Sequence, residues 1–157
     1  MKKLIIGLIS IVGIFLSFQM QGQRLSIETM QTLYDTKTLN QADGFLKTIN
    51  YTFVTTRDDK AEYMHNKLIG VHNFAYMVYI TVDNSTYQIS EVEIMSQDVS
   101  DFDYYKSQAE ENGFELVISR PENKGISYHY IKKEGRQLVI IYKAKDVIEV
   151  SYSIVKQ

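Results

Sequence analysis

Cysteine is absent from the 157-residue sequence, and this absence excludes several kinds of chemistry. Without thiolates the chain has no disulfide, no cysteine nucleophile and no metal site built on sulfur ligands. A bacterial lipoprotein anchor is excluded as well, because the lipid is carried by a cysteine just after an apolar leader. The fold must therefore be held together by packing.

Common catalytic and phosphate-binding motifs are also absent. No serine lies in a GxSxG nucleophile elbow, and the glycines stand singly rather than in GxGxxG or GxxxxGK loops. The three histidines, His65, His72 and His129, are accompanied by no HExxH motif and no carboxylate at metal-ligand spacing. The sequence therefore predicts no catalytic residue, no metal site and no cofactor, and a protein that is not an enzyme.

The carboxylate pairs fit structural roles. Asp101 and Asp103 fit the first turn of a helix, where negative charge is favourable. Glu91 and Glu93 lie two residues apart and so share one face of a strand, which we expect to be solvated. Neither pair carries the signature of acid and base catalysis, which requires one carboxyl group of a pair to be buried.

No apolar run reaches the length of a typical membrane-spanning helix. Leu4 to Phe18 holds fifteen apolar or small residues, whereas a span needs about 20. Lys2 and Lys3 precede this run and polar residues follow it, which is typical of a secretory signal peptide over residues 1–22. The sequence thus predicts export to the periplasm or the exterior. The small-x-small cleavage rule is met at only one position before Gln23, so an uncleaved N-terminal anchor is the alternative.

Linkers and runs of one charge are absent from residues 23–157. This part has one proline, Pro121, and no Ser/Gly-rich or low-complexity stretch. Without Lys2 and Lys3 it carries 15 basic and 19 acidic residues, a net charge of −4. Such a mildly acidic, mixed surface favours neither a nucleic acid nor an anionic membrane as a partner. We expect one compact body with no stable membrane insertion after signal cleavage.

Two helices are expected first, and four strands follow them. Apolar residues at spacings of three and four predict a helix from Ile27 that ends near Asp35 to Lys37, and a second one from Asn40, as its cap, to Ile49. The hydrophobic period then changes to two, which is typical of half-buried strands. The expected strands are Tyr51 to Thr56, Glu62 to Leu68, Phe74 to Val82 and Tyr87 to Met95.

The same order of elements begins again at Ser100. Ser100 and Asp103 predict the start of a third helix, and Asn112-Gly113 its end. The strands expected after it are Phe114 to Ser119, Ile126 to Lys132, Gln137 to Lys143 and Val147 to Ile154, the last of them an exposed edge strand.

The two halves can be laid over one another. A shift of 63 places Tyr51 on Phe114, Phe53 on Leu116 and Val78 on Ile141, and a shift of 58 aligns the last strands. Either the halves, residues 38–97 and 98–157, are a true duplication, or they share only a pattern. Both interpretations predict an α+β fold, with helices packed on one face of an antiparallel sheet in two tandem helix-plus-four-strand units.

This element order, from about Asn40 onward, is similar in outline to secreted inhibitors of the β-lactamase-inhibitor-protein type. The resemblance implies a concave sheet that grips a partner protein. It rests on element order and no motif carries it, so it assigns no site residues.

Tyrosine is abundant, with 12 tyrosines against 7 phenylalanines and no tryptophan. Its flat ring and polar tip suit both strand packing and binding faces. The candidate binding residues are Tyr128 with Tyr130, which point to one side of their strand, and Tyr76 with Tyr79. We therefore expect a secreted or periplasmic protein that binds another envelope or extracellular protein through an open, tyrosine-rich sheet face.

Two other functions stay open at this point. A carrier or sensor for a small apolar ligand would enclose a pocket of about 300 Å³ or more between helices and sheet. A hydrolase would bring His129 or His65 together with carboxylates in a cleft.

Overall fold

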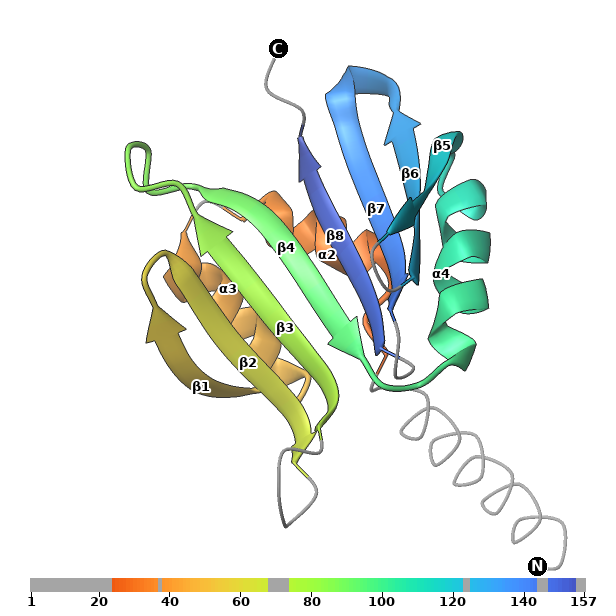
Figure 1. The fold of residues 1–157 in the computed structure, drawn as a ribbon. Helices are drawn as coiled ribbons and strands as arrows, with labels where there is room; N and C mark the ends of the chain where they lie inside the picture. The colour runs from red at the N-terminus through yellow and green to blue at the C-terminus, as the bar shows by residue number, and fades with distance from the viewer. Residues whose placement is uncertain (1–23, 37, 68–73, 123–124, 144–146, 155–157) are drawn as a thin grey trace, which may run out of the picture.

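One antiparallel sheet of eight strands forms the centre of the structure, a computed structural model that describes residues 24–36, 38–67, 74–122, 125–143 and 147–154 (Figure 1). The helices are α2 (Ile27–Tyr34), α3 (Leu39–Thr48) and α4 (Ser100–Glu111), and a short 3-10 turn, η1, spans Lys133–Gly135. The strands are β1 (Thr52–Arg57), β2 (Lys60–Lys67), β3 (Phe74–Val82), β4 (Ile89–Ser96), β5 (Glu115–Glu122), β6 (Gly125–Lys132), β7 (Arg136–Lys143) and β8 (Val147–Ile154). The mixed helix and antiparallel-sheet class is confirmed. Within these ranges no helix combines the length and apolarity that a membrane crossing requires.

The strand order is β1-β2-β3-β4-β8-β7-β6-β5. Two meanders of four strands thus meet through their last strands, β4 and β8, which pair antiparallel from Glu91 opposite Ser153 to Ser96 opposite Ile148. The expectation that Val147 to Ile154 is an edge strand is wrong, because β8 lies between β4 and β7 and has a partner on each side. The outer edges of the sheet are β1 and β5.

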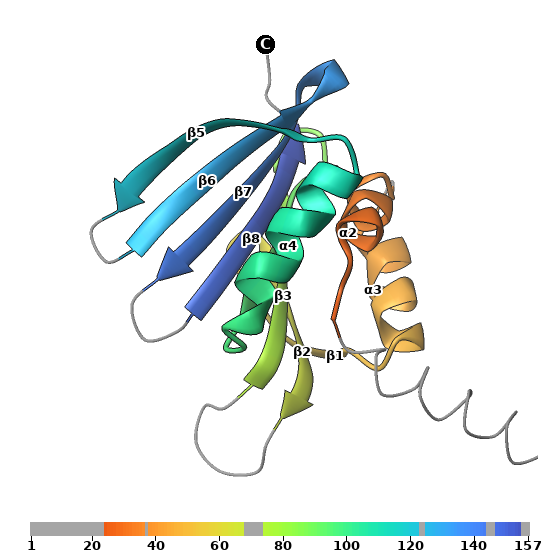
Figure 2. The same ribbon diagram turned by 90° about the vertical axis from the view of Figure 1, so that its right-hand side faces the viewer.

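Alternate residues of the strands pack with the helices into one core. Figure 1 shows α2 and α3 behind the strands, and Figure 2 shows α2, α3 and α4 on the same side of the sheet. The 0% exposed residues of the central strands on this side are Val78, Ile80, Val92, Ile94, Leu138, Ile140, Ile148, Val150 and Tyr152. The helices contribute Ile27, Met30, Leu33, Ala42, Leu46, Tyr105 and Ala109. We call this the helix side of the sheet and the opposite one the outer face.

Two helix starts differ from those expected. Thr38, rather than Asn40, caps α3, because its hydroxyl accepts a hydrogen bond from the Gln41 backbone N–H. Ser100 lies inside α4, whose N-cap position is Val99. The Ser100 hydroxyl donates to the Asp98 carboxylate at 2.7 Å instead. Before α4 it is the Asp98 carboxylate, two positions ahead of the helix, that accepts from the Ser100 backbone N–H at 2.9 Å. Neighbouring polar side chains thus compete for the backbone N–H groups of a first turn, which a sequence pattern does not resolve.

The ends of α3 and α4 match at the shift of 63. Asn50 and Gly113 both have left-handed backbones, with φ of 66° and 76°. Each is followed by the same 2.9 Å backbone hydrogen bond, from Tyr51 to Leu46 and from Phe114 to Ala109. The edge strands that follow have matching bulges, at Val54 in β1 and Val117 in β5.

The shift of 63 fails in the third strand of each half. Val78 is fully buried on the helix side, whereas Ile141 pairs with Glu149 on the outer face. The cross-strand pairing aligns Val78 with Leu138 instead. Val78 pairs with Tyr63 in the second strand of its half, and Leu138 pairs with Tyr130 in the second strand of the other half. Because a displacement of one residue turns a side chain to the other face, that part of the sequence alignment was wrong.

Two glycines provide a test of the packing. A methyl group added at Gly125 would lie 1.8 Å from the carbonyl oxygen of Tyr142, whereas one at Gly44, within α3, meets nothing within 4 Å. Gly125→Ala should therefore lower the free energy of unfolding by about 2 kcal/mol or more, because the β6–β7 pairing must shift. Gly44→Ala should raise it by roughly 0.5–1 kcal/mol, because alanine is the better helix former. Urea unfolding followed by circular dichroism measures both. Equal effects of the two substitutions would contradict this packing.

Candidate functional site

Three of the four candidate tyrosines lie on the helix side of the sheet. Tyr130 is 1% exposed and Tyr76 is 7% exposed. Tyr128 is partly buried under α4, where its ring lies 5.4 Å from that of Phe102. Only Tyr79 among these four lies on the outer face. The alternation of strand residues predicted that Tyr128 and Tyr130 share a side, but which side the helices cover depends on the tertiary structure.

Tyr79 lies in the middle of a cross-strand row on the outer face. It stands opposite Glu62 in β2 and Glu93 in β4, and Glu93 stands opposite Ser151 in β8. Lys60 reaches into this row, with its ammonium group 3.0 Å from the Glu93 carboxylate and 5.5 Å from the centre of the Tyr79 ring. Burial raises the pKa of the Tyr79 hydroxyl, and Glu62 and Glu93 raise it further. The phenol therefore stays neutral at physiological pH and can donate a hydrogen bond.

The glutamates of this face were expected to be solvated, but they are largely covered by neighbouring side chains. The side chain of Glu93 is 14% exposed, and that of Glu149, which pairs with Lys143, is 12% exposed. Burial raises the pKa of Glu91, and the neighbouring Glu93 raises it further. The reason is position, because β4 and β8 are central strands whose outer residues are flanked by side chains on both sides. These charges are thus preoriented, which lowers the cost of ordering them in a complex.

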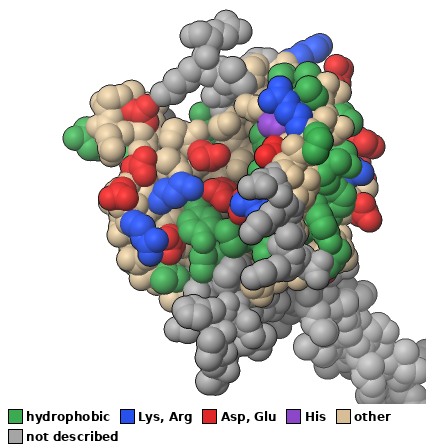
Figure 3. All heavy atoms as spheres, viewed as in Figure 1, with side chains coloured by type: hydrophobic (Ala, Val, Ile, Leu, Met, Phe, Trp, Pro, Cys, Tyr) green, Lys and Arg blue, Asp and Glu red, His purple; other side chains and the backbone are tan. Residues whose placement is uncertain are grey.

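Apolar side chains occupy the next row of the outer face. Met77 pairs with Met95, Met95 with Glu149, and Glu149 with Ile141, so all four point to the same side. Figure 3 views this face and shows hydrophobic, acidic and basic side chains side by side on it. Methionine and aromatic side chains are enriched in protein interfaces, whereas lysine and glutamate are depleted there, and Met77 is only 8% exposed.

A serine, a histidine and a glutamate meet near the β5–β6 edge, in a cluster that no sequence motif indicates. The Ser127 hydroxyl lies 2.8 Å from the Glu122 carboxylate and 3.2 Å from Nε2 of His129. In a nucleophilic triad the histidine lies between the serine and the carboxylate and accepts the serine proton. Here the serine lies in the middle, and its single proton goes to the carboxylate, the stronger acceptor. Ser127 is also 1% exposed. The geometry thus supports a structural bridge across the β5–β6 hairpin.

The other two histidines of the sequence are His65 and His72. His72 and the side chain of His65 lie outside the described residues. Within the part of the chain that the structure describes, no three histidine or carboxylate side chains come close enough to hold a metal ion.

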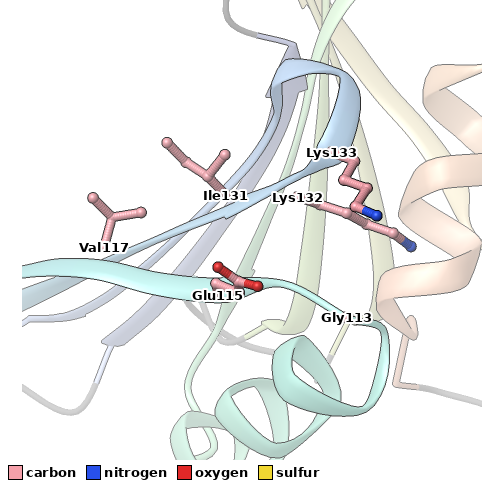
Figure 4. A pocket seen from close by; sticks show the side chains of 6 residues that line it. All are labelled: Gly113, Glu115, Val117, Ile131, Lys132 and Lys133. Atoms are coloured by element: carbon pink, nitrogen blue, oxygen red, sulfur yellow. The ribbon is translucent and has the colours of Figure 1, made fainter.

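An open hollow of about 480 Å³ runs beside the edge strand β5 (Figure 4). Val117 and Ile131 project from the same side of neighbouring strands, and the side chains of Lys132 and Lys133 extend toward the α4–β5 turn. Val117 is 60% exposed. It is also the bulged residue of β5, and Pro121 in the same strand lacks an N–H group, so this edge is poorly suited to pairing with another strand.

A buried ion pair joins Arg24, in the segment before α2, to Asp101 at the junction of the two halves. Asp101, at the start of α4, is 0% exposed, and its Oδ1 lies 2.5 Å from Nε of Arg24, a charge contact rather than a well-formed hydrogen bond. The Ser96 hydroxyl, at the end of β4, donates to the other carboxylate oxygen. Burial raises the pKa of Asp101, against the opposing effects of Ser96 and Arg24.

Arg24 is held from several directions in this cluster. Its guanidinium group lies 4.6 Å from the centre of the Tyr104 ring, 3.0 Å from the Ser100 hydroxyl and 3.5 Å from the Asp98 carboxylate. The sequence pattern explained Asp101 by the helix dipole alone and missed its partner, which is 77 positions away in the chain. The role of this cluster is structural, because its contacts hold the segment before α2 against α4.

No family model, no curated protein and no solved structure matches the chain.

Removal of Arg24 should leave a buried carboxylate without its cation. We expect Arg24→Ala to lower the free energy of unfolding by about 2 kcal/mol at neutral pH. Because burial places the pKa of folded Asp101 above that of the unfolded chain, this loss should shrink as the pH falls through that pKa and the carboxyl group is protonated.

The double variant Arg24→Ala/Asp101→Asn is the matched control, because its amide is neutral at every pH. Compared with this double variant, the single variant Arg24→Ala should be less stable at pH 7, and the difference between the two should narrow at about pH 5 in urea titrations. A single variant whose deficit stays constant over this range would show that the deficit does not come from the carboxylate.

Proposed function

We propose that the chain is a non-enzymatic binding protein, exported to the periplasm or the exterior, and that another envelope or extracellular protein docks on the outer face of its sheet. The observation that carries this proposal is the row Glu62, Tyr79, Glu93 and Ser151, in which an aromatic ring lies between two glutamates and one of them, Glu93, is half-buried and ion-paired with Lys60. Aromatic side chains that are held in place lose little entropy on binding and commonly dominate interface energies.

Two further observations favour the outer face over the rest of the molecule. Large side chains with no exposure, including Leu46, Tyr105 and Tyr152, fill the space between the helices and the sheet, which favours an external partner over an enclosed apolar ligand. Both sheet edges carry a bulge, which disfavours partners that add a strand. The location rests on the leader-like residues 1–22, which lie outside the described residues.

We also infer that residues 38–97 and 98–157 are tandem copies, each with its helix packed on the same side of the sheet. The matching left-handed residues, helix-end hydrogen bonds and bulges, all at a shift of 63, support this inference. The pairing of β4 with β8 would then join two equivalent strands, and the outer face would span both copies.

Site-specific crosslinking tests the docking face. A photoreactive benzoylphenylalanine at position 151, in the middle of the outer face, should form a covalent adduct with one envelope protein, whereas the same group at the exposed position Asp103 of α4 should not. Mass spectrometry identifies the adduct. Because Tyr79 lies in the row beside Ser151, Tyr79→Ala should lower the adduct yield about tenfold.

Tyr79→Phe and Thr32→Ala are the matched controls, since the first keeps the ring and the second removes an exposed side chain of α2. Both should retain most of the adduct. A yield at position 151 that is absent, or no higher than at position 103, would overturn the proposed face.

A further inference from the structure

A second candidate site lies at the end of the sheet where two turns meet the start of α3, away from the outer face and from the Arg24 cluster. Here a hollow of about 350 Å³ opens between the β1–β2 turn, the β3–β4 turn and the first residues of α3. Figure 1 shows the β3–β4 turn projecting beyond the strands at this end. The hollow is lined by Thr38, Leu39, Asn40, Thr56, Asp58, Asp59, Ala61, Val82, Asn84 and Tyr87.

Tyr87 is the aromatic residue of this hollow, and it is held out in solvent. Its side chain is 77% exposed, the highest value among the large hydrophobic residues that the structure describes. Its backbone has a φ of 57°, which is unfavourable for a bulky side chain and persists only when the surroundings enforce it. In the sequence Tyr87 lies at the start of an expected strand, where alternation explains it, and this exposure is not predicted.

The β3–β4 turn fixes Tyr87 by a set of hydrogen bonds to Asp83. The Tyr87 N–H donates to the Asp83 carbonyl at 2.7 Å, and the Asp83 N–H donates to the Gln88 carbonyl at 2.9 Å. The Asp83 carboxylate accepts from the backbone N–H groups of Ser85, at 2.9 Å, and Thr86, at 3.1 Å. The ring is thus presented by an ordered turn, so a ligand that stacks on it does not have to order the turn first.

Hydrogen-bond donors and acceptors line the same hollow as Tyr87. The carboxylates of Asp58 and Asp59 are acceptors, and the amides of Asn40 and Asn84 both donate and accept. Within the described residues, no hydrogen bond or ion pair is formed by these four side chains. Leu39, Ala61 and Val82 supply a small apolar floor. The hollow therefore offers one aromatic face, a short apolar surface, and donors and acceptors that are available to a ligand.

We propose that this hollow binds a carbohydrate, with one sugar ring stacked on Tyr87. A pyranose has an apolar C–H face that fits an aromatic ring, and its hydroxyl groups donate to carboxylates and accept from amides. An anionic ligand is disfavoured by Asp58 and Asp59. A basic peptide could place its cation on the carboxylates and the ring and accept from the amides through its backbone carbonyls. Its binding would depend on salt, which distinguishes it from a neutral sugar in the test below. The neutral, hydroxyl-rich ligand uses all three kinds of group.

This site rests on residues that the proposed protein-binding face does not use, so each can fail without the other. It would allow the chain to hold a surface glycan at one end of the sheet while a protein occupies the outer face.

Titration with defined neutral oligosaccharides tests the site. The purified chain is mixed with tetrasaccharides of glucose, N-acetylglucosamine, galactose and mannose, and saturation-transfer NMR and calorimetry report binding. At least one sugar should bind, and Tyr87→Ala should weaken it about tenfold. Tyr87→Phe should stay within about twofold, because the ring remains. Alanine and phenylalanine both carry a Cβ that this left-handed backbone must accommodate, so neither relieves the turn as glycine would, and the pair compares a site with and without a ring.

Tyr79→Ala, on the outer face, is the control and should leave sugar binding unchanged. Asp58→Asn should weaken a sugar only modestly, because the amide keeps an acceptor oxygen, and binding should be insensitive to salt. Lack of binding by all four sugars at millimolar concentration would overturn the proposal, as would sugar binding that survives Tyr87→Ala. Binding of an oligolysine peptide that Asp58→Asn and salt abolish, with no sugar bound, would assign the hollow to basic segments instead.

Discussion

The antiparallel pairing of β4 with β8 is the constraint on which the rest of the structure depends. Each half supplies a meander of four strands. A single helix can cover only part of the apolar side of a sheet of that size. Pairing of the two last strands brings Val92, Ile94, Val150 and Tyr152 together in the middle, where all four have no exposure. It also decides which residues face outward in the centre, since Glu93 and Ser151 then become neighbours on the outer face.

The Arg24–Asp101 pair closes the same junction from the helix side. Asp101 follows the end of β4, so its ionic contact fixes the exit of the central strand, the start of α4 and the segment before α2 at one point. A buried charge of this kind contributes little net stability compared with an apolar replacement, but its geometry admits few alternatives. The outer face uses charge differently, because Lys60 with Glu93 and Lys143 with Glu149 are half-buried pairs that hold their side chains in place at the surface.

Much of the secondary structure could be predicted, because local spacing carries the information. The expected strand Phe74 to Val82 and the expected helix that ends before Asn112-Gly113 coincide with β3 and α4. Local spacing did not predict the environment of a side chain where that environment depends on residues distant in the chain. Asp101 was explained by the helix dipole, since its partner Arg24 comes from another part of the chain. Glu91 and Glu93 were expected in solvent, since nothing in their neighbourhood indicates that β4 is central. Tyr87 looked like a strand residue, since its exposure depends on the turn that Asp83 closes.

The sequence by itself determined the period of each segment, the ends of most helices and strands to within about three residues, and the exclusion of thiol chemistry, because these depend on residue types and on neighbours within a few positions. Only the tertiary structure decided which side of each strand is covered. Tyr128 and Tyr130 were known to share a side, and the packing of α4 buried that side, whereas Tyr79 was left on the outer face. The physical reason is that alternation is symmetric between the two faces of a sheet, and long-range packing of helices is what makes them different.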